Sequence, residues 1–351
     1  MVSIEYIKSL VRLNILQLKP YSSARDEFKG NADVFLDANE NPYGSPLENE
    51  NYNRYPDPLQ ISLKKVISFK KKINLENIFV GNGSDEPIDI LFRIFCRPGI
   101  DEVIICPPSY GMYEVSANIN DIRCRKIYLT NEFQLDVKVI LQNVHCETRM
   151  LFICSPNNPS GNAMHKEDIE FLLENFSGIV VIDEAYIDFC PEKSWLPFLN
   201  KYPNLVILQT FSKAYGLAGL RIGMAFAHSE IISWMNKVKP PYNLNSYSIE
   251  KATESILSFD RVEAWIEEIR EERNFLSNEL KKLNITEKVF PSDANFILVQ
   301  FKDAAKIYSL CSQNGIILRD RSSQYGCQNC LRITIGTPQE NRKLLTFLNK
   351  I

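Results

Sequence analysis

Short apolar runs that end in polar or Gly/Pro-rich tips are the feature that most restricts the fold of this chain. Such runs lie at residues 78–80, 102–106, 150–154, 179–182 and 205–209. Segments with helical periodicity separate most of them, and continuous apolar strands are typical of a mostly parallel sheet covered by helices on both faces. Ligands on such sheets bind at the carboxyl ends of the strands, where the polar tips lie. The pattern therefore predicts an α/β fold with a site at that edge.

The length of 351 residues predicts about two domains. We expect an N-terminal helix and arm at residues 1–30, a large domain at 31–245 with helices flanking a mostly parallel mixed sheet, and a smaller α+β domain at 246–351. Residues 34–36 predict a strand that runs into a turn. Thr337 to Glu340 has the capping-box pattern, with proline at the first helical position, and opens the last helix.

Composition excludes several function classes. The net charge of −3 and pI near 5.8 provide no electrostatic footprint for nucleic acid or an anionic membrane. Only three histidines occur, and none stands at a strand end with a serine or cysteine partner, which argues against triad chemistry and histidine-ligated metals. Glu5, Lys8 and Arg12 interrupt any signal-peptide core, and no apolar run approaches the roughly 20 residues that span a bilayer. The nine cysteines show no disulfide spacing, so we expect a cytoplasmic protein with reduced thiols.

A lysine segment follows the apolar run at residues 205–209. Thr210, Ser212 and Arg221 offer two hydroxyls and a guanidinium, which suit a phosphate dianion. Lys213 lies among them and could form a Schiff base with an aldehyde. Pyridoxal 5'-phosphate (PLP) supplies both the aldehyde and the phosphate. Taken alone, Lys213 would be interpreted as an ordinary surface lysine.

Two further strand tips allow more than one interpretation. Gly81-x-Gly83 precedes a helix with Ser84 or Asp85 at its start, where backbone amides can bind an anion. The same glycines are also typical of a plain tight turn, and the pattern is neither a dinucleotide fingerprint nor a Walker A loop. Tyr110 at the next tip could stack on a flat heterocycle or simply pack against the following helix.

Four separated motifs together resemble the fold-type I PLP-dependent aminotransferases over nearly the whole chain. They are SPNNPSG at 155–161, DEAY at 183–186, residues 210–223, and Arg332. Four longer segments of the sequence are similar to those of the histidinol-phosphate aminotransferases of that family. The similarity lies in LDANENP at 36–42, RYPDP at 54–58, CPPSYGMY at 106–113 and DEAYIDF at 183–189.

The resemblance implies a role for each residue around the cofactor. Lys213 would hold PLP covalently and transfer the proton, and Asp183 would pair with the pyridine nitrogen and keep it protonated. Tyr186 and Asn158 would bond the ring's phenolic oxygen, and Asn158 is preferred to Asn157 because it directly precedes the proline. Tyr110 would stack on the ring. The phosphate would be held by Ser84 and Asp85 through backbone N–H groups, by Thr210, Ser212 and Arg221, and by Tyr55 of the neighbouring subunit in a homodimer with shared sites.

The resemblance also implies the substrates. Arg332 would clamp the α-carboxylate of glutamate, Arg319 and Tyr21 would recognise the phosphate of histidinol phosphate, and Asn39 would belong to the substrate site. The implied reaction converts histidinol phosphate and 2-oxoglutarate to imidazole acetol phosphate and glutamate. Cys327 and Cys330 fit no pattern of the family, and their loop could alter substrate choice.

Two alternatives remain open. One is a PLP-dependent decarboxylase of a phosphorylated amino acid such as threonine phosphate, which would use the same cofactor residues. The other is a PLP-binding regulatory module, which is disfavoured because about 30 residues precede the expected sheet and they contain no helix-turn-helix or basic patch.

Overall fold

The computed structural model describes residues 2–21, 33–47 and 52–351, and its larger part is built on a seven-stranded sheet. The strand order is β1-β7-β6-β5-β4-β2-β3. All strands run parallel except β7, which is antiparallel to both of its neighbours, β1 and β6. The strands are β1 (Ile78–Asn82), β2 (Glu102–Ile105), β3 (Arg123–Lys126), β4 (Thr148–Cys154), β5 (Ile179–Asp183), β6 (Leu205–Thr210) and β7 (Ile222–Ala227). The predicted mostly parallel mixed sheet is confirmed.

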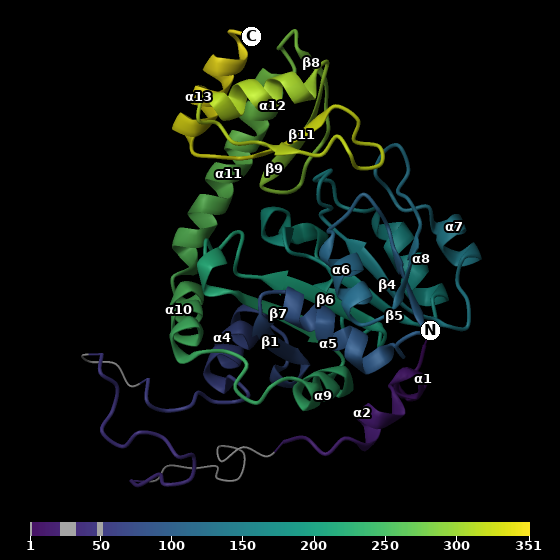
Figure 1. Cartoon of the computed structure of the whole chain (residues 1–351), viewed down its shortest axis with the longest axis vertical. Coiled ribbons are helices and arrows are strands. Elements are labelled where there is room, and N and C mark those ends of the chain that lie inside the picture. Colours follow the sequence, from purple (N-terminus) through teal and green to yellow (C-terminus); the bar gives the residue numbers. More distant parts are fainter. Residues whose placement is uncertain (1, 22–32, 48–51) are drawn as a thin grey trace.

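Helices cover both faces of this sheet because its strands are apolar on both sides (Figure 1). Ile104, Leu151 and Val180 belong to one core cluster, whereas their chain neighbours Val103, Met150 and Val181 belong to the other. The helices of this part are α1 (Ile4–Leu10), α2 (Leu13–Gln17), α4 (Ile61–Lys71), α5 (Asp85–Phe95), α6 (Met112–Ile119), α7 (Val137–Gln142), α8 (Lys166–Asn175) and α9 (Ser229–Val238). Single 3₁₀ turns lie at Leu75–Asn77, Ile187–Phe189, Pro191–Lys193, Leu196–Phe198 and Ala218–Leu220.

A smaller antiparallel sheet with its own core follows in the sequence. Its order is β10-β11-β9-β8, and Leu276, Ile297 and Leu331 are among its buried residues. The long helix α11 extends from the side of the large sheet up to this part (Figure 1). The capping box of Thr337 and Glu340 is confirmed at the start of α13. The elements are α10 (Ser246–Leu257), α11 (Phe259–Leu280), β8 (Thr286–Val289), β9 (Phe296–Phe301), α12 (Ala304–Gln313), β10 (Arg319–Asp320), β11 (Cys330–Thr334) and α13 (Pro338–Leu348).

The predicted strand at residues 34–36 is wrong. This stretch has no regular secondary structure, and Val34 and Leu36 are 69% and 88% exposed. A strand forms where its backbone pairs with that of a neighbouring strand, and no described strand pairs with residues 34–36. The segment that contains it runs along the outside of the folded body (Figure 1).

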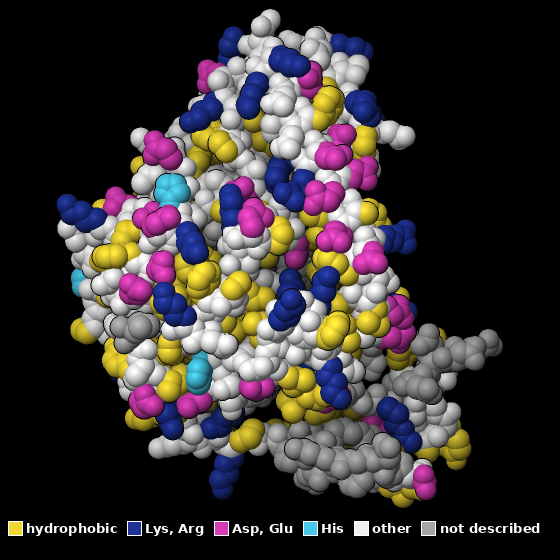
Figure 2. Space-filling view, turned by 180° about the vertical axis from the view of Figure 1, so that it is seen from behind, with side chains coloured by type: hydrophobic (Ala, Val, Ile, Leu, Met, Phe, Trp, Pro, Cys, Tyr) yellow, Lys and Arg dark blue, Asp and Glu magenta, His cyan; other side chains and the backbone are white. Residues whose placement is uncertain are grey.

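Charge and hydropathy of the surface agree with the composition. Lys and Arg alternate with Asp and Glu over the face seen in Figure 2, without a continuous basic stripe on that face. Among the described residues, no helix has the length and apolar character that a bilayer crossing requires.

Candidate active site

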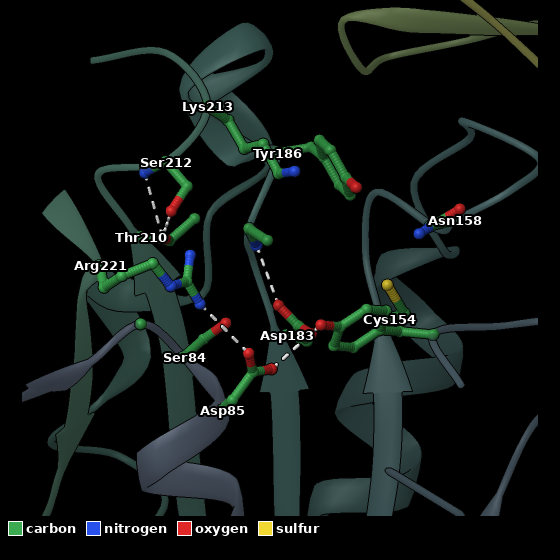
Figure 3. A pocket seen from close by; sticks show the side chains of 13 residues that line it. Ser84, Asp85, Cys154, Asn158, Asp183, Tyr186, Thr210, Ser212, Lys213 and Arg221 are labelled. Carbon is green, nitrogen blue, oxygen red and sulfur yellow. Dashed lines mark hydrogen bonds and ion pairs between the residues drawn. The ribbon is translucent and has the colours of Figure 1, made fainter. Parts of the chain in front are cut away.

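A cavity opens at the carboxyl ends of the central strands and encloses about 500 Å³ of space, its open mouth included. Ten of the residues expected around the cofactor line it together, with Gly83, Cys154 and Ala185 as additional wall residues (Figure 3). The ten are Ser84, Asp85, Tyr110, Asn158, Asp183, Tyr186, Thr210, Ser212, Lys213 and Arg221.

One end of the cavity is formed by the N-terminus of α5. The helix begins at Asp85, and Ser84 occupies the N-cap position without making a side-chain capping bond. The amide of Gly83 donates to the carbonyl of Arg221 at 2.9 Å. A Cβ on Gly223 would collide with the backbone of Gly83 and Ser84, so glycine permits this close approach of β7 to the helix start. Free helical amides and the helix dipole make this end suitable for an anion.

Arg221 points its guanidinium into the same end of the cavity (Figure 3). Its backbone is left-handed, with a φ of 56°, a conformation that non-glycine residues rarely adopt. Its Nη2 lies 3.4 Å from Asp85 Oδ2, and the Tyr110 hydroxyl donates to Asp85 Oδ1 at 3.0 Å. The Thr210 hydroxyl lies 3.0 Å from that of Ser212. Two hydroxyls and one guanidinium therefore converge with the helix amides.

Asp183 ends β5 at the floor of the cavity and is 2% exposed. Its carboxylate accepts hydrogen bonds from the Tyr113 hydroxyl at 2.6 Å and the Ala185 amide at 3.0 Å. Burial nevertheless raises the pKa of Asp183, because water no longer stabilises the ionised form. A cationic ring nitrogen at this point would compensate for the lost hydration.

Tyr113 has a place in this site that the sequence did not reveal. It is 1% exposed, and its ring stacks on Phe152 with centroids 4.9 Å apart. Its position three residues after Tyr110 places both on one side of the start of α6, which was the only available signal.

Lys213 lies on the segment that follows β6 and faces the cavity beside Tyr186 (Figure 3). Its Nζ is 5.4 Å from the centroid of the Tyr186 ring. Partial burial and then the positive charge of Arg332 lower the pKa of the lysine, while Asp183 acts in the opposite direction. A lowered pKa increases the fraction of neutral, nucleophilic amine at a given pH.

The small sheet lies beside the cavity, where its Arg332 contacts a residue of the cavity lining. Arg332 donates from Nη1 to Asn158 Oδ1 at 2.6 Å, and its guanidinium lies 5.2 Å from the centroid of Phe296. The side chain of Asn157 instead donates to the Pro108 carbonyl and the Ser160 hydroxyl, so Asn158 is the asparagine that faces the cavity. Arg319 lies directly opposite Arg332 in the β10–β11 pair and is exposed.

Three expected residues lie elsewhere in the single chain. Asn39 and Tyr55 line a second cavity, where the Tyr55 ring stacks on Tyr242 at 4.5 Å. Tyr21 is 74% exposed and lines a third cavity near Pro58. Within one chain, none of the three lines the cavity that contains Lys213. The loop with Cys327 and Cys330 forms a turn, in which the Cys330 amide donates to the Cys327 carbonyl, and both thiols are buried.

The residues of the cavity fit PLP. The anion-binding end would hold the phosphate, Asp183 would face the pyridine nitrogen, and Lys213 would reach the aldehyde. The fit rests on the donor set at the start of α5 and on the buried carboxylate of Asp183, whose ionised form a cationic ring nitrogen would stabilise.

Comparison with known proteins agrees with this geometry. The sequence pattern of the family "Aminotransferase class I and II" matches residues 29–348. The chain is 51% identical over 342 residues to a histidinol-phosphate aminotransferase of Cytophaga hutchinsonii, covering 97% of this chain and 98% of the relative. It is 48% identical over 345 residues to one of Bacteroides thetaiotaomicron, covering 98% of each.

Solved structures share the fold. The histidinol-phosphate aminotransferase of Clostridium acetobutylicum superposes with a TM-score of 0.79 at 25% identity, over 86% of this chain and 91% of that one. That of Sinorhizobium meliloti, in complex with PLP, has a TM-score of 0.78 at 22% identity, over 89% of each chain. The chain therefore belongs to the class I and II aminotransferases, a PLP-dependent family of enzymes.

Proposed function

We propose that this enzyme transfers the amino group of histidinol phosphate to 2-oxoglutarate, giving imidazole acetol phosphate and glutamate. The observation that carries the proposal is the cavity lined by Lys213 and Asp183, with Arg332 bonded to Asn158 of its lining. Lys213 and Asp183 would act on any amine substrate, whereas the guanidinium of Arg332 favours substrates that carry an anionic group. Relatives about half identical over nearly the whole chain are named for this reaction.

The cofactor supplies an aldehyde that binds the amine and a protonated ring that withdraws electrons from the reacting carbon. Lys213 Nζ is the base that takes the proton from the α-carbon of the amine. Because the pKa of Lys213 is lowered, more of its side-chain amine is unprotonated at a given pH and able to accept a proton.

Asp183 keeps its negative charge toward the pyridine nitrogen. The Tyr113 hydroxyl and the Ala185 amide donate to the carboxylate and favour its ionised form, although burial opposes it. Both bonds also fix the orientation of the carboxylate in the cavity floor.

The remaining cofactor residues position the ring. Tyr110 is assigned to the ring face, and Asn158 and Tyr186 to the phenolic oxygen. The cofactor phosphate is assigned to the amides of Ser84 and Asp85, the hydroxyls of Thr210 and Ser212, the Arg221 guanidinium, and Tyr55 of a second subunit.

We assign the substrate-binding residues according to the anionic groups of the two substrates. Arg332 takes the α-carboxylate of glutamate in a bidentate manner. Arg319 and Tyr21 take the phosphate of histidinol phosphate, and Asn39 borders the substrate. The two anions occupy the same wall in alternate half-reactions.

A homodimer accounts for the residues that one chain leaves outside the cavity. Tyr43 and Leu36 are 96% and 88% exposed in an extended segment, which is unusual for apolar side chains in a chain that acts alone. A second subunit that covers this segment would bring Asn39 and Tyr55 toward the neighbouring site. We place the homodimer in the cytoplasm because biosynthesis of this kind uses soluble phosphorylated substrates.

The test is an absorbance titration of PLP-loaded enzyme with histidinol phosphate in the absence of a keto acid. Stoichiometric conversion of the lysine-bound PLP band to the pyridoxamine form, reversed by 2-oxoglutarate, is the expected result. An unchanged band would overturn the proposal.

The same titration with threonine phosphate tests the decarboxylase alternative. A threonine-phosphate decarboxylase of Porphyromonas gingivalis shares the fold at 22% identity and a TM-score of 0.70. Release of carbon dioxide from threonine phosphate, with no response to histidinol phosphate, would favour that reaction instead.

A further inference from the structure

Three arginines share one face of the small sheet. Arg319 is paired with Arg332 across β10 and β11, and the Arg321 amide donates to the Cys330 carbonyl at 3.0 Å, so Arg321 continues the same register. Side chains of paired residues in an antiparallel ladder point to the same face, and every second residue along a strand returns to that face. Arg319, Arg321 and Arg332 therefore lie on one face, and Asp320 lies on the other.

This face is the one that looks into the active site. Arg332 bonds Asn158 and lies over Phe296, whose ring contacts that of Tyr186 with centroids 5.0 Å apart. Burial raises the pKa of the Tyr186 phenol, and the positive charges of Arg332 and Arg321 both act in the opposite direction. Arg321 therefore lies on the face from which Arg332 reaches Asn158, a residue of the cavity lining.

None of the three arginines forms an ion pair with another described residue. The Nε atoms of Arg321 and Arg332 are buried and have no hydrogen-bond acceptor. Elsewhere in the chain, Arg149 and Arg125 are paired with the buried carboxylates Asp101 and Glu102. Unpaired, partly buried cations beside one another are unfavourable, so their retention indicates an anion that comes from outside.

We propose that Arg321 is a substrate-binding residue that, with Arg319, holds the phosphate monoester of the amine substrate and thereby determines the preference for phosphorylated amines. This inference rests on the proposed function. A carboxylate needs one bidentate guanidinium, which Arg332 provides, whereas a phosphate monoester carries nearly two charges and three acceptor oxygens. The half-buried Arg321 holds such a group in fewer positions than the exposed Arg319 can.

The first experiment compares histidinol phosphate with histidinol as amine donors to the loaded enzyme. For Arg321→Gln we expect KM for histidinol phosphate to rise about tenfold or more, the loss typical of one charge-assisted hydrogen bond. KM for histidinol and for glutamate should change less than about twofold, and Arg321→Lys should recover part of the loss. The matched control is Arg342→Gln. It removes a guanidinium on α13 that lies over the ring of Phe275 on α11, and it should leave all three KM values unchanged.

Equal losses with histidinol phosphate and histidinol, or equal losses with histidinol phosphate and glutamate, would overturn the assignment. An unchanged KM for histidinol phosphate in Arg321→Gln would do the same.

A second experiment uses inorganic phosphate as the probe and needs no turnover. Phosphate should raise the melting temperature of the loaded wild-type enzyme and of Arg342→Gln, and this rise should be lost in Arg321→Gln. Without phosphate, Arg321→Gln should melt at the wild-type temperature or above it, because no ion pair is broken. A purely structural role would instead lower the melting temperature and keep the phosphate effect.

The two experiments separate the two proposals. If the wild-type enzyme turned over neither amine, the proposed function would fail, and phosphate stabilisation would decide the role of Arg321 by itself. If the wild-type enzyme used histidinol phosphate but Arg321→Gln retained both KM and phosphate stabilisation, only the assignment of Arg321 would fail.

Discussion

The two walls of the active site differ in how far their polar groups are satisfied within the chain. The cofactor wall, at the strand ends of the large sheet, joins its polar groups to one another: Tyr113 bonds Asp183, and Tyr110 and Arg221 both contact Asp85. The arginine wall of the small sheet has buried Nε atoms without acceptors. Both walls bind anions in our proposal, yet the three arginines lack carboxylate partners among the described residues, and Arg332 bonds the neutral side chain of Asn158.

The difference follows from how long each anion stays. A resident cofactor meets a wall held in one geometry by its own hydrogen bonds, which lowers the cost of ordering at each turnover. Substrates with different anionic groups alternate on the other wall, and a guanidinium already paired with a carboxylate would have to break that pair each time. We therefore expect cofactor-wall variants to harm all substrates alike and arginine-wall variants to discriminate between them.

The largest effect is expected from Lys213→Ala. Loss of Lys213, the one lysine of the described residues that lines the cavity, should lower the amino-transfer rate by about 10⁴-fold or more, because the nucleophile and the base are one group. Single-turnover absorbance measurements test this, with the exposed Lys65→Ala as the control. A normal rate in Lys213→Ala would remove this residue from the cofactor wall.

Asp183→Asn should reduce kcat/KM by about 10²–10³-fold, the range for loss of one preorganised electrostatic group at a reacting centre. Because the effect acts through the ring nitrogen, kcat/KM should fall by the same factor for histidinol phosphate, histidinol and glutamate. Steady-state kinetics with the three substrates measure it. Discrimination among them would show that the two walls do not divide the work as proposed.

Arg332→Gln should raise KM for glutamate by about tenfold to a hundredfold, through loss of a bidentate carboxylate contact. It should also raise the pKa of Lys213, because the charge of Arg332 is the second cause, after burial, that lowers it. At a fixed pH less of the lysine would then be neutral, so the pH midpoint for PLP loading of cofactor-free enzyme should move upward. A midpoint unchanged from wild type would show that the charge of the arginine wall does not reach the lysine.

The smallest effect on activity is expected from Glu184→Gln, next to Asp183 but turned away from the cavity. Glu184 accepts from the Trp195 amide, Ser194 and Gln209, and burial raises its pKa to about 7. Activity should stay within about twofold, since no cavity residue contacts the side chain.

The pH dependence of the unfolding free energy should instead reveal the raised pKa of Glu184. A carboxyl whose pKa is about 7 when folded and near 4.5 when unfolded binds more protons in the folded state between these values. Wild-type stability therefore contains a contribution that is fully present below about pH 4.5 and is lost as pH rises to 7, about 3 kcal/mol in all. Urea unfolding from pH 4.5 to 7.5 should show a flatter profile in Glu184→Gln, and parallel profiles would refute the raised pKa.

The cofactor wall and two residues of the arginine wall, Arg319 and Arg332, could be predicted from the sequence, whereas Arg321 could not. Asp183 and Thr210 each end an apolar run, and parallel strands bring their carboxyl ends to one edge. Arg321 gave no such signal, because the two-residue strand β10 is too short to show alternation. Its direction depends on its pairing with β11, which joins residues from another part of the chain.

The error at Val34 and Leu36 has the same origin. Their apolar pattern is local, but a strand needs a partner, and the described chain offers none at this position.

The sequence by itself determined the class of fold and the edge of the sheet that carries the site, because the geometry of a parallel sheet brings the tips of its strands together. The residues expected around the cofactor came from the resemblance of the motifs to the aminotransferase family. Only the tertiary structure decided that Tyr113 bonds Asp183, that Glu184 turns away from the cavity, and that three arginines share one face of the small sheet without carboxylate partners among the described residues. These facts depend on contacts between distant segments, whose distance and direction no local pattern encodes.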